Sequence, residues 1–265
     1  LIMTGTKEQS RIMEGGQEHR DTAPTRDPAT ICAFRVKTER YDVLKTTRED
    51  GPPDPLAEKE GDDWVIRCHR QTNDDDRFCV FHQLPAGRGH PEVYEDCRCE
   101  LEERPKELDD GTVADLFRRS ITDDLEADDI DCDVVDDTLS LDSRSRHRNQ
   151  FIGAQFGDIR LTYDSLEPDD NYPIDMRCCG AQELDWKEAT IGNELRLDRS
   201  LFFGGVSLQK ATLKSSVGIS SVITDRNVSL YGATVDGEVR LNDATVDGDA
   251  SLYGATVDGD ASLYR

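Results

Sequence analysis

The sequence has few lysines, few aromatic residues and no long apolar segment. Only eight of its 32 basic residues are lysine, and 56 acidic residues give a formal charge of −24. No apolar run approaches the ~20 residues of a membrane-spanning helix, and the N-terminus lacks the layout of a signal peptide. We therefore expect no transmembrane segment and a cytoplasmic protein. Because no basic face emerges, we also expect no direct binding of nucleic acid.

Recognisable catalytic motifs are also missing. The sequence has no glycine-rich phosphate loop, no nucleophile elbow and no His-Glu-x-x-His helix. Histidine is scarce, with five residues in the chain and none in residues 151–265. The absence of these motifs predicts a protein that is not an enzyme.

An eleven-residue repeat dominates the last third of the sequence. Four positions of the repeat keep one residue type through about seven copies. One apolar series comprises Leu197, Leu208, Ile219, Leu230, Leu241, Leu252 and Leu263, and a small series comprises Ala189, Ser200, Ala211, Val222, Ala233, Ala244 and Ala255. Two further apolar series start at Leu195 and Ile191, and the latter has one polar member, Thr224. Self-similarity at a short fixed period indicates a solenoid, in which each unit buries its apolar face by stacking on its neighbours.

Residues within one repeat alternate between apolar and polar. In residues 233–241, apolar side chains face one way while Thr234, Glu238 and Arg240 face the other. A period of two is typical of strands rather than helices. We therefore expect two short strands in each repeat, such as 244–246 and 250–252.

Most of these repeats also have a glycine near the centre. Gly237, Gly248 and Gly259 are flanked by Asp or Glu. Glycine beside Asp is typical of turns, because glycine accepts a positive φ without steric cost. We therefore expect a bend at each of these glycines and another near Tyr253-Gly254. Two repeats would then form one four-sided coil, with Ala, Leu, Val and Ile filling a narrow interior.

The repeat resembles that of the pentapeptide-repeat family, in which a small Ala lies two positions before a central Leu or Phe. Ala211-Thr212-Leu213, Ala233-Thr234-Val235 and Ala250-Ser251-Leu252 follow this pattern. The resemblance covers about Phe151 to Arg265, and it implies a mainly β fold, a right-handed quadrilateral β-helix, without indicating an activity. Successive alanines are five and then six residues apart here, where the family keeps five, and this leaves a triangular or flattened coil open.

A weaker form of the repeat begins earlier. Phe151–Leu161 carries the Ala-x-Phe core, and residues 174–181 look like a further coil that is shifted by one residue. Cys178 and Cys179 lie near the small position of the repeat. We expect one of them to fill the interior, since free cysteine packs as a small apolar residue.

Five cysteines and three histidines lie between Cys32 and Cys99. Cys79 and His82 are three residues apart, as on a single turn, with Cys68 shortly before them and Cys32 further upstream. A Cys₃His set suits tetrahedral zinc and leaves no open coordination position. We therefore predict a structural zinc site at Cys32, Cys68, Cys79 and His82, which would hold together a polar segment with few apolar contacts.

Two alternatives to a zinc site stay open. In the first, the cysteines are buried thiols without a ligand role. In the second, Cys68 and Cys79 form a redox-responsive module with Cys97 and Cys99, which we also regard as second-choice ligands. The stretch Asp76-Arg77-Phe78-Cys79-Val80-Phe81-His82 also resembles a segment that precedes such repeats in pentapeptide-repeat proteins of halophilic archaea. That resemblance implies a recurring small α+β module in front of the solenoid.

Four regions follow from these patterns. Residues 1–29 are polar and without periodicity, so we expect a disordered tail. The Cys/His module occupies 30–104, a helix and an acidic linker occupy 105–150, and the solenoid occupies 151–265. The last coil has no capping segment, from which we expect a chain that is truncated at its C-terminus or that self-associates through an open solenoid end.

The acidic composition and the repeat surface together indicate a role for the solenoid. High acidity with few lysines resembles the proteins of salt-accumulating halophiles, where salt screens the self-repulsion. Because repeat surfaces generally serve as extended binding faces, we expect a non-enzymatic scaffold that binds an unknown protein partner. The alternative is an acidic mimic of DNA that binds a topoisomerase or another DNA-binding protein. Its outward carboxylates would be Asp236, Asp247, Asp249, Asp258 and Asp260.

Overall fold

The structure is a computed structural model. It describes residues 32–37, 57–70, 72, 78–85, 109–122, 149–167 and 171–264. The predicted tail at 1–29, most of the acidic linker and Cys97-Arg98-Cys99 lie outside the described residues.

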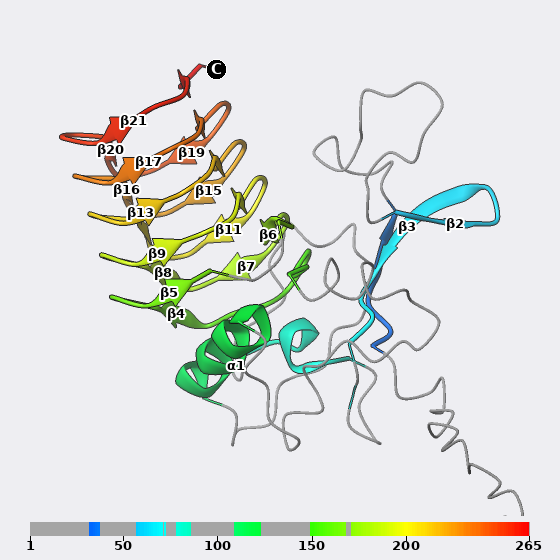
Figure 1. Cartoon of the computed structure of the whole chain (residues 1–265). Coiled ribbons are helices and arrows are strands. Elements are labelled where there is room, and N and C mark those ends of the chain that lie inside the picture. Colours follow the sequence, from blue (N-terminus) through cyan, green and yellow to red (C-terminus); the bar gives the residue numbers. More distant parts are fainter. Residues whose placement is uncertain are drawn as a thin grey trace, which may run out of the picture.

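The C-terminal region is a β-solenoid of about five coils whose strands form four parallel sheets (Figure 1). The first sheet comprises β6 (Ile174–Asp175), β10 (Leu195–Arg196), β14 (Val217–Gly218), β18 (Val239–Arg240) and β22 (Ala261–Ser262). The second comprises β7 (Gly180–Ala181), β11 (Leu201–Phe202), β15 (Ile223–Thr224) and β19 (Thr245–Val246). The third comprises β4 (Asp158–Arg160), β8 (Glu183–Asp185), β12 (Val206–Ser207), β16 (Val228–Ser229) and β20 (Ala250–Ser251). The fourth comprises β5 (Ser165–Leu166), β9 (Thr190–Ile191), β13 (Thr212–Leu213), β17 (Thr234–Val235) and β21 (Thr256–Val257).

The register of these sheets confirms a four-sided coil made of two repeats. Leu195 pairs with Val217, so one coil takes 22 residues. The step from β6 to β10 is one residue shorter, because Ile174 pairs with Leu195, and this confirms the predicted shift. Cys179 is the cysteine that fills the interior there: its side chain is buried and its thiol donates to the carbonyl of Phe151 at 2.9 Å.

Apolar side chains fill the interior, and two polar members of the repeat series, Thr224 and Ser200, are satisfied locally. Thr224 is buried, and its hydroxyl donates to the carbonyl of Gly204. Ser200 is buried as well, where its hydroxyl donates to the carbonyl of Met176 at 2.7 Å and accepts from the backbone N–H of Cys179 at 3.1 Å. A buried hydroxyl with both a donor and an acceptor partner costs little to bury.

The central glycines lie at bends as predicted, but the predicted reason, a positive φ, was wrong. Gly237, Gly248 and Gly259 do not have positive φ. They are needed because adjacent coils approach closely at this corner: a Cβ on Gly237 would lie 2.6 Å from the backbone nitrogen of Ser216 in the coil before it. A Cβ on Gly259 would lie 2.7 Å from the backbone of Gly237. The spacing between coils, rather than the local turn, therefore selects glycine.

Positive φ occurs at another corner of every repeat. The residues are eleven apart, namely Glu188, Arg199, Lys210, Ser221, Gly232, Asp243 and Gly254. Only two of the seven are glycine, although glycine accepts this backbone conformation best. The bend predicted at Tyr253-Gly254 belongs to this series and is confirmed.

Helix α1 (Asp110–Thr122) lies under the first coil, at the opposite end of the stack from β22 (Figure 1). Asp109 starts it by accepting a hydrogen bond from the backbone N–H of Thr112, and this bond lowers the pKa of the Asp109 carboxyl. Its apolar residues Val113, Ala114, Phe117 and Ile121 are buried, and the ring centroid of Phe117 lies 5.8 Å from that of Trp186 in the coil interior.

The Cys/His region has little regular structure among its described residues. Strands β1 (Arg35–Lys37), β2 (Glu58–Glu60) and β3 (Asp63–Arg67) form a small antiparallel sheet in the order β1-β3-β2. A short 3₁₀ helix, η4 (Val80–His82), follows. The chain is therefore mainly β, with a small Cys/His region in front of the solenoid.

Candidate metal centre

The structure brings the four predicted ligands together. Their ligand atoms, the Sγ atoms of Cys32, Cys68 and Cys79 and a ring nitrogen of His82, all lie within 4.8 Å of one another. All four side chains are buried, with exposed fractions of 5% or less. The predicted set therefore forms one buried cluster rather than separate thiols.

Two local structures position the ligands. β1 pairs with β3, and the ladder continues past both strands, where the N–H of Cys32 donates to the carbonyl of Arg70 and the N–H of Cys68 donates to that of Phe34. This pairing places Cys32 beside Cys68. The other two ligands come from η4, where Cys79 precedes the helix and His82 ends it.

Three distances within the cluster match the edges of a tetrahedron around a metal ion. The Sγ atoms of Cys68 and Cys79 are 3.7 Å apart. The Nδ1 atom of His82 lies 3.3 Å from the Sγ of Cys79 and 3.7 Å from that of Cys32. Around tetrahedral zinc, bonds of about 2.3 Å to sulfur and about 2.05 Å to nitrogen separate two sulfurs by about 3.8 Å and sulfur from nitrogen by about 3.6 Å.

The surroundings of His82 suit a metal ligand. Its Nε2 lies 3.1 Å from the carbonyl oxygen of Ile152, to which an Nε2–H donates. A proton on Nε2 leaves the lone pair on Nδ1, which points at the sulfurs. The ring of Phe34 stacks on the imidazole at 3.9 Å between centroids and fixes its plane.

The electrostatics of the cluster favour ionised sulfur beside positive charge. Burial raises the pKa of the Cys32 thiol, and hydrogen bonds with Cys68 and Cys79 raise it further. Burial also opposes the thiolate of Cys79, but hydrogen bonds from the other two cysteines and the charge of His82 hold its pKa well below the ordinary value. For His82, burial is outweighed by the charges of Cys68 and Cys79, which raise its pKa to about 10. A cavity that stabilises thiolate and attracts positive charge is suited to a cation.

This geometry is typical of a structural rather than a catalytic metal site. Four protein ligands complete a tetrahedron, and the burial of all four leaves no accessible position for substrate or water. Cys68 and Cys79 are free cysteines, since their 3.7 Å separation far exceeds the ~2.05 Å of a disulfide bond.

Sequence reasoning missed a buried cation beside this centre. Arg70 is 1% exposed, and its guanidinium lies over the rings of both Phe81 and Phe151, at 4.9 Å and 4.5 Å from their centroids. Its Nη1 donates to the hydroxyl of Ser120 on α1 at 2.8 Å. Cation–π contacts join residues that are far apart in sequence, so no local pattern announces them.

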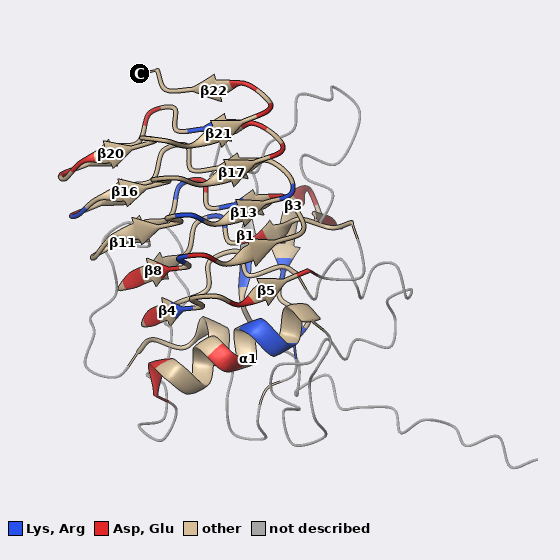
Figure 2. Ribbon diagram, turned by 60° about the vertical axis from the view of Figure 1, so that its left-hand side comes forward, with Lys and Arg blue, Asp and Glu red and all other residues tan. Residues whose placement is uncertain are grey.

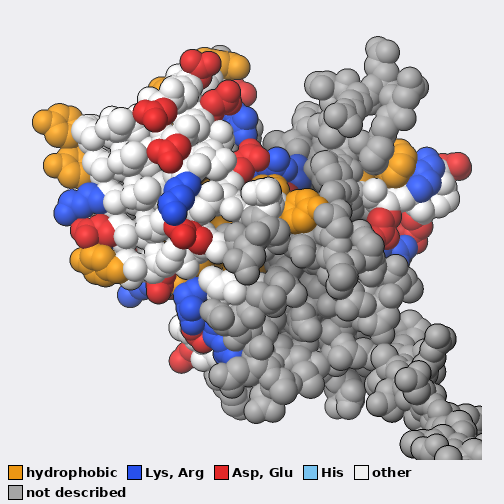
Figure 3. Space-filling model, in the orientation of Figure 1, with side chains coloured by type: hydrophobic (Ala, Val, Ile, Leu, Met, Phe, Trp, Pro, Cys, Tyr) orange, Lys and Arg blue, Asp and Glu red, His pale blue; other side chains and the backbone are white. Residues whose placement is uncertain are grey.

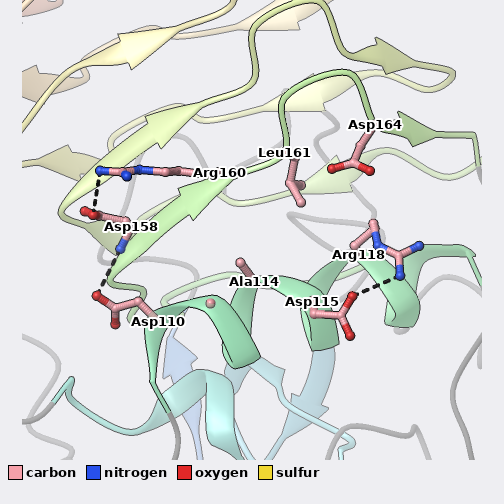
Figure 4. A pocket seen from close by; sticks show the side chains of 9 residues that line it. Asp110, Ala114, Asp115, Arg118, Asp158, Arg160, Leu161 and Asp164 are labelled. Atoms are coloured by element: carbon pink, nitrogen blue, oxygen red, sulfur yellow. Dashed lines mark hydrogen bonds and ion pairs between the residues drawn. The ribbon is translucent and has the colours of Figure 1, made fainter.

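A second hollow, of about 420 Å³, lies between α1 and the first coil (Figure 4). Its charged groups pair with each other: Arg160 with Asp158 at 3.0 Å, and Arg118 with Asp115 at 2.9 Å. The carboxylate of Asp110 accepts from the backbone N–H of Asp158 at 3.3 Å. Of these contacts, the one between Asp110 and Asp158 attaches the helix to the coil, and none points to a reaction.

The solenoid surface carries both charges, but the pairing changes along the axis. Figure 3 shows charged side chains of both signs spread over one face, with no single basic patch. The first coils contain ion pairs, such as Arg196–Glu194 and Lys210–Glu188. Figure 2 shows acidic residues at turns of the last coils. The five aspartates of the predicted acidic ladders are exposed there and form no ion pair within the described residues; they are Asp236, Asp247, Asp249, Asp258 and Asp260.

Comparison with protein-family models, with curated proteins and with solved structures found no match. No helix within the described residues combines the length and the apolar character that crossing a bilayer requires. Cys97 and Cys99, the second-choice ligands, lie outside the described residues.

Proposed function

We propose that this protein is a non-enzymatic scaffold, in which a structural zinc ion holds the Cys/His region on a β-solenoid that binds a protein partner. The observation that carries the zinc assignment is the buried Cys₃His cluster, in which three interatomic distances match tetrahedral edges. Thiolate and imidazole are the ligands that zinc prefers in closed sites, and hard cations such as Mg²⁺ and Ca²⁺ prefer oxygen.

Metal content tests this assignment. Protein purified without chelator in molar salt should contain one zinc per chain by mass spectrometry, and Cys79→Ser/His82→Ala should contain none. Cys179→Ala is the matched control, because it removes a buried thiol from the solenoid interior and should keep the metal. A wild-type protein without metal, or one whose cluster thiols are readily alkylated, would contradict a structural site and favour a redox-responsive module.

The scaffold role is supported by an exposed aromatic pair on a rigid surface. Tyr231 and Tyr253 lie one coil apart, stacked at 5.7 Å between centroids, and are 45% and 76% exposed. Tyrosine is enriched in protein interfaces because it offers a large contact area at a small cost in side-chain entropy. The stacking of coils holds the two rings at a fixed spacing, and a binding face requires such fixed positions.

Proximity labelling in the host cell tests the interaction. We expect a reproducible set of labelled proteins that is lost in Tyr231→Ser/Tyr253→Ser. Tyr163→Ser is the control, since Tyr163 is 73% exposed on the first coil and away from the pair. The same labelled set from all three chains would contradict this binding face.

A second candidate, mimicry of DNA, rests on the unpaired carboxylates of the last coils. Asp236 and Asp258 occupy equivalent positions one coil apart, so their charges repeat along the axis. In a titration with a purified topoisomerase, mimicry requires binding that disappears when the ladder aspartates are changed to Asn. Equal binding of the neutralised chain would exclude it.

A further inference from the structure

The candidate metal centre connects the N-terminal segments to the first layer of the solenoid. Besides the hydrogen bond from His82 Nε2 to the carbonyl of Ile152, the carbonyl of Phe81 accepts from the backbone N–H of Gln155 at 2.7 Å. Both solenoid groups belong to the partial coil that precedes β4. Two backbone groups of this layer are thus satisfied by the turn that bears Cys79 and His82.

This partial coil is the terminal layer of two sheets. Gln150 bridges to Asp175 in β6, and Gln155 bridges to Gly180 in β7, both in parallel. The other two sheets end at β4 and β5, which α1 covers. The cap of the solenoid therefore has two parts, the helix and the Cys/His segments, and Arg70 joins them through Phe81, Phe151 and Ser120.

The Cys/His part of the cap comes together at its ligands, and Phe34, Ile66 and Phe81 join it to the apolar core of the solenoid. The three ligand-bearing segments, around Cys32, Cys68 and η4, meet at the cluster itself, where the N–H of Cys79 also donates to the Sγ of Cys32 at 3.3 Å. Small domains with little apolar core commonly fold only when their metal is bound. An open layer of a β-stack, with free N–H and C=O groups, pairs readily with another chain.

We propose that occupancy of the centre gates the N-terminal edge of the solenoid. With metal bound, the Cys/His segments cover the layer of Ile152 and Gln155 and the chain does not associate there. Loss of the metal releases these segments, and the uncovered layer then pairs with the same layer of a second copy. The proposal rests on the proposed function, because it requires that the cluster binds metal.

Hydrogen exchange with mass spectrometry, together with light scattering, tests the gate on the full chain. Loaded protein is compared with protein stripped by chelator and with protein reloaded with Zn²⁺. We expect the Gln155 amide to exchange at least tenfold faster after stripping, and the amide of Leu208, inside the stack, to stay protected. The scattering mass should rise toward a dimer and return on reloading. Thr234→Ser, at an exposed position of β17 in a later coil, should behave as wild type.

Several outcomes would overturn the gate. A stripped chain with unchanged exchange at Gln155 and unchanged mass would refute it while leaving a zinc site intact. Loss of protection at Leu208 as well would show that the metal supports the whole fold rather than the cap. A chain that never binds Zn²⁺ would refute both the gate and the zinc assignment.

Discussion

Replacing Gly237 by alanine should destabilise the solenoid more than replacing Gly232, five residues earlier on the same coil. The two glycines differ in the physical reason for which they are needed. A Cβ at position 237 would lie 2.6 Å from the nitrogen of Ser216 and 2.8 Å from the carbonyl carbon of Ser215, both backbone atoms. At position 232, the backbone has φ +64°, and the nearest atom, in the side chain of Lys210, is 3.5 Å away.

The expected magnitudes follow from these geometries. Forcing one carbon into a packed contact costs about 1–3 kcal/mol, and here the neighbour is backbone that can move only with its coil. A left-handed conformation costs an ordinary residue about 1–2 kcal/mol. Alanine recovers about 0.4–1 kcal/mol in both variants, because it restricts the unfolded chain. Subtraction leaves about 0–1.6 kcal/mol for Gly232→Ala and about 0–2.6 kcal/mol for Gly237→Ala, and we expect the latter near the top of its range because its close neighbours are backbone atoms.

Urea denaturation followed by circular dichroism measures the difference, provided that the m-value stays constant between variants. Hydrogen exchange at the amides of Val217 and Val239, which flank the contact, should show whether the loss is local. A Gly232→Ala variant that is less stable than Gly237→Ala would refute the reasoning, since the turn conformation rather than the coil spacing would then be limiting.

Three further predictions concern buried polar groups of the solenoid. Ser200→Ala should lower the free energy of unfolding by about 1–3 kcal/mol in urea denaturation, because the N–H of Cys179 and the carbonyl of Met176 lose a buried partner; an unchanged midpoint would contradict this. Arg177→Met should cost about 3–5 kcal/mol by the same assay, since it leaves the 1% exposed Asp175 without the guanidinium that now bonds both its oxygens; a loss below 1 kcal/mol would show that water replaces the arginine. Burial raises the pKa of Asp198 above 3.8, so the folded state takes up its proton more readily and ionisation opposes folding above the native pKa. Asp198→Asn, which keeps an acceptor for the N–H of Ser220, should therefore stabilise at pH 7 in thermal unfolding, with a gain that shrinks as pH falls toward 3.8; a gain that grows on acidification would contradict the sign.

The repeat made the fold predictable, because each copy restates the same constraints. Leu197 and its equivalents predicted the interior, and the alternation in residues 233–241 predicted the strands. The reason for Gly237 could not be derived in this way, because a close approach to Ser216 exists only once the coils are stacked at a known distance. A local pattern shows that glycine is present but does not distinguish lack of space from positive φ.

The cluster was predictable in its members but not in its setting. Cys79 and His82 could be identified from the sequence, because their residue types are preferred zinc ligands and their spacing suits one metal ion. The hydrogen bond from His82 to Ile152 joins residues 70 positions apart, and the contact of Arg70 with the Phe151 ring joins residues still further apart. Such contacts depend on tertiary packing, which a single sequence does not encode in any short window.

Because each coil contains two repeats, adding an even number of repeats differs in its effect from adding an odd number. Residues 244–253 and 255–264 are identical in sequence. Insertion of a single copy would carry every following residue half a turn around the axis, so that Tyr253 would emerge on the opposite side from Tyr231. Insertion of two copies would lengthen the rod and leave each face unchanged. Any function that reads one face of this protein should therefore tolerate even changes in repeat number and fail with odd ones.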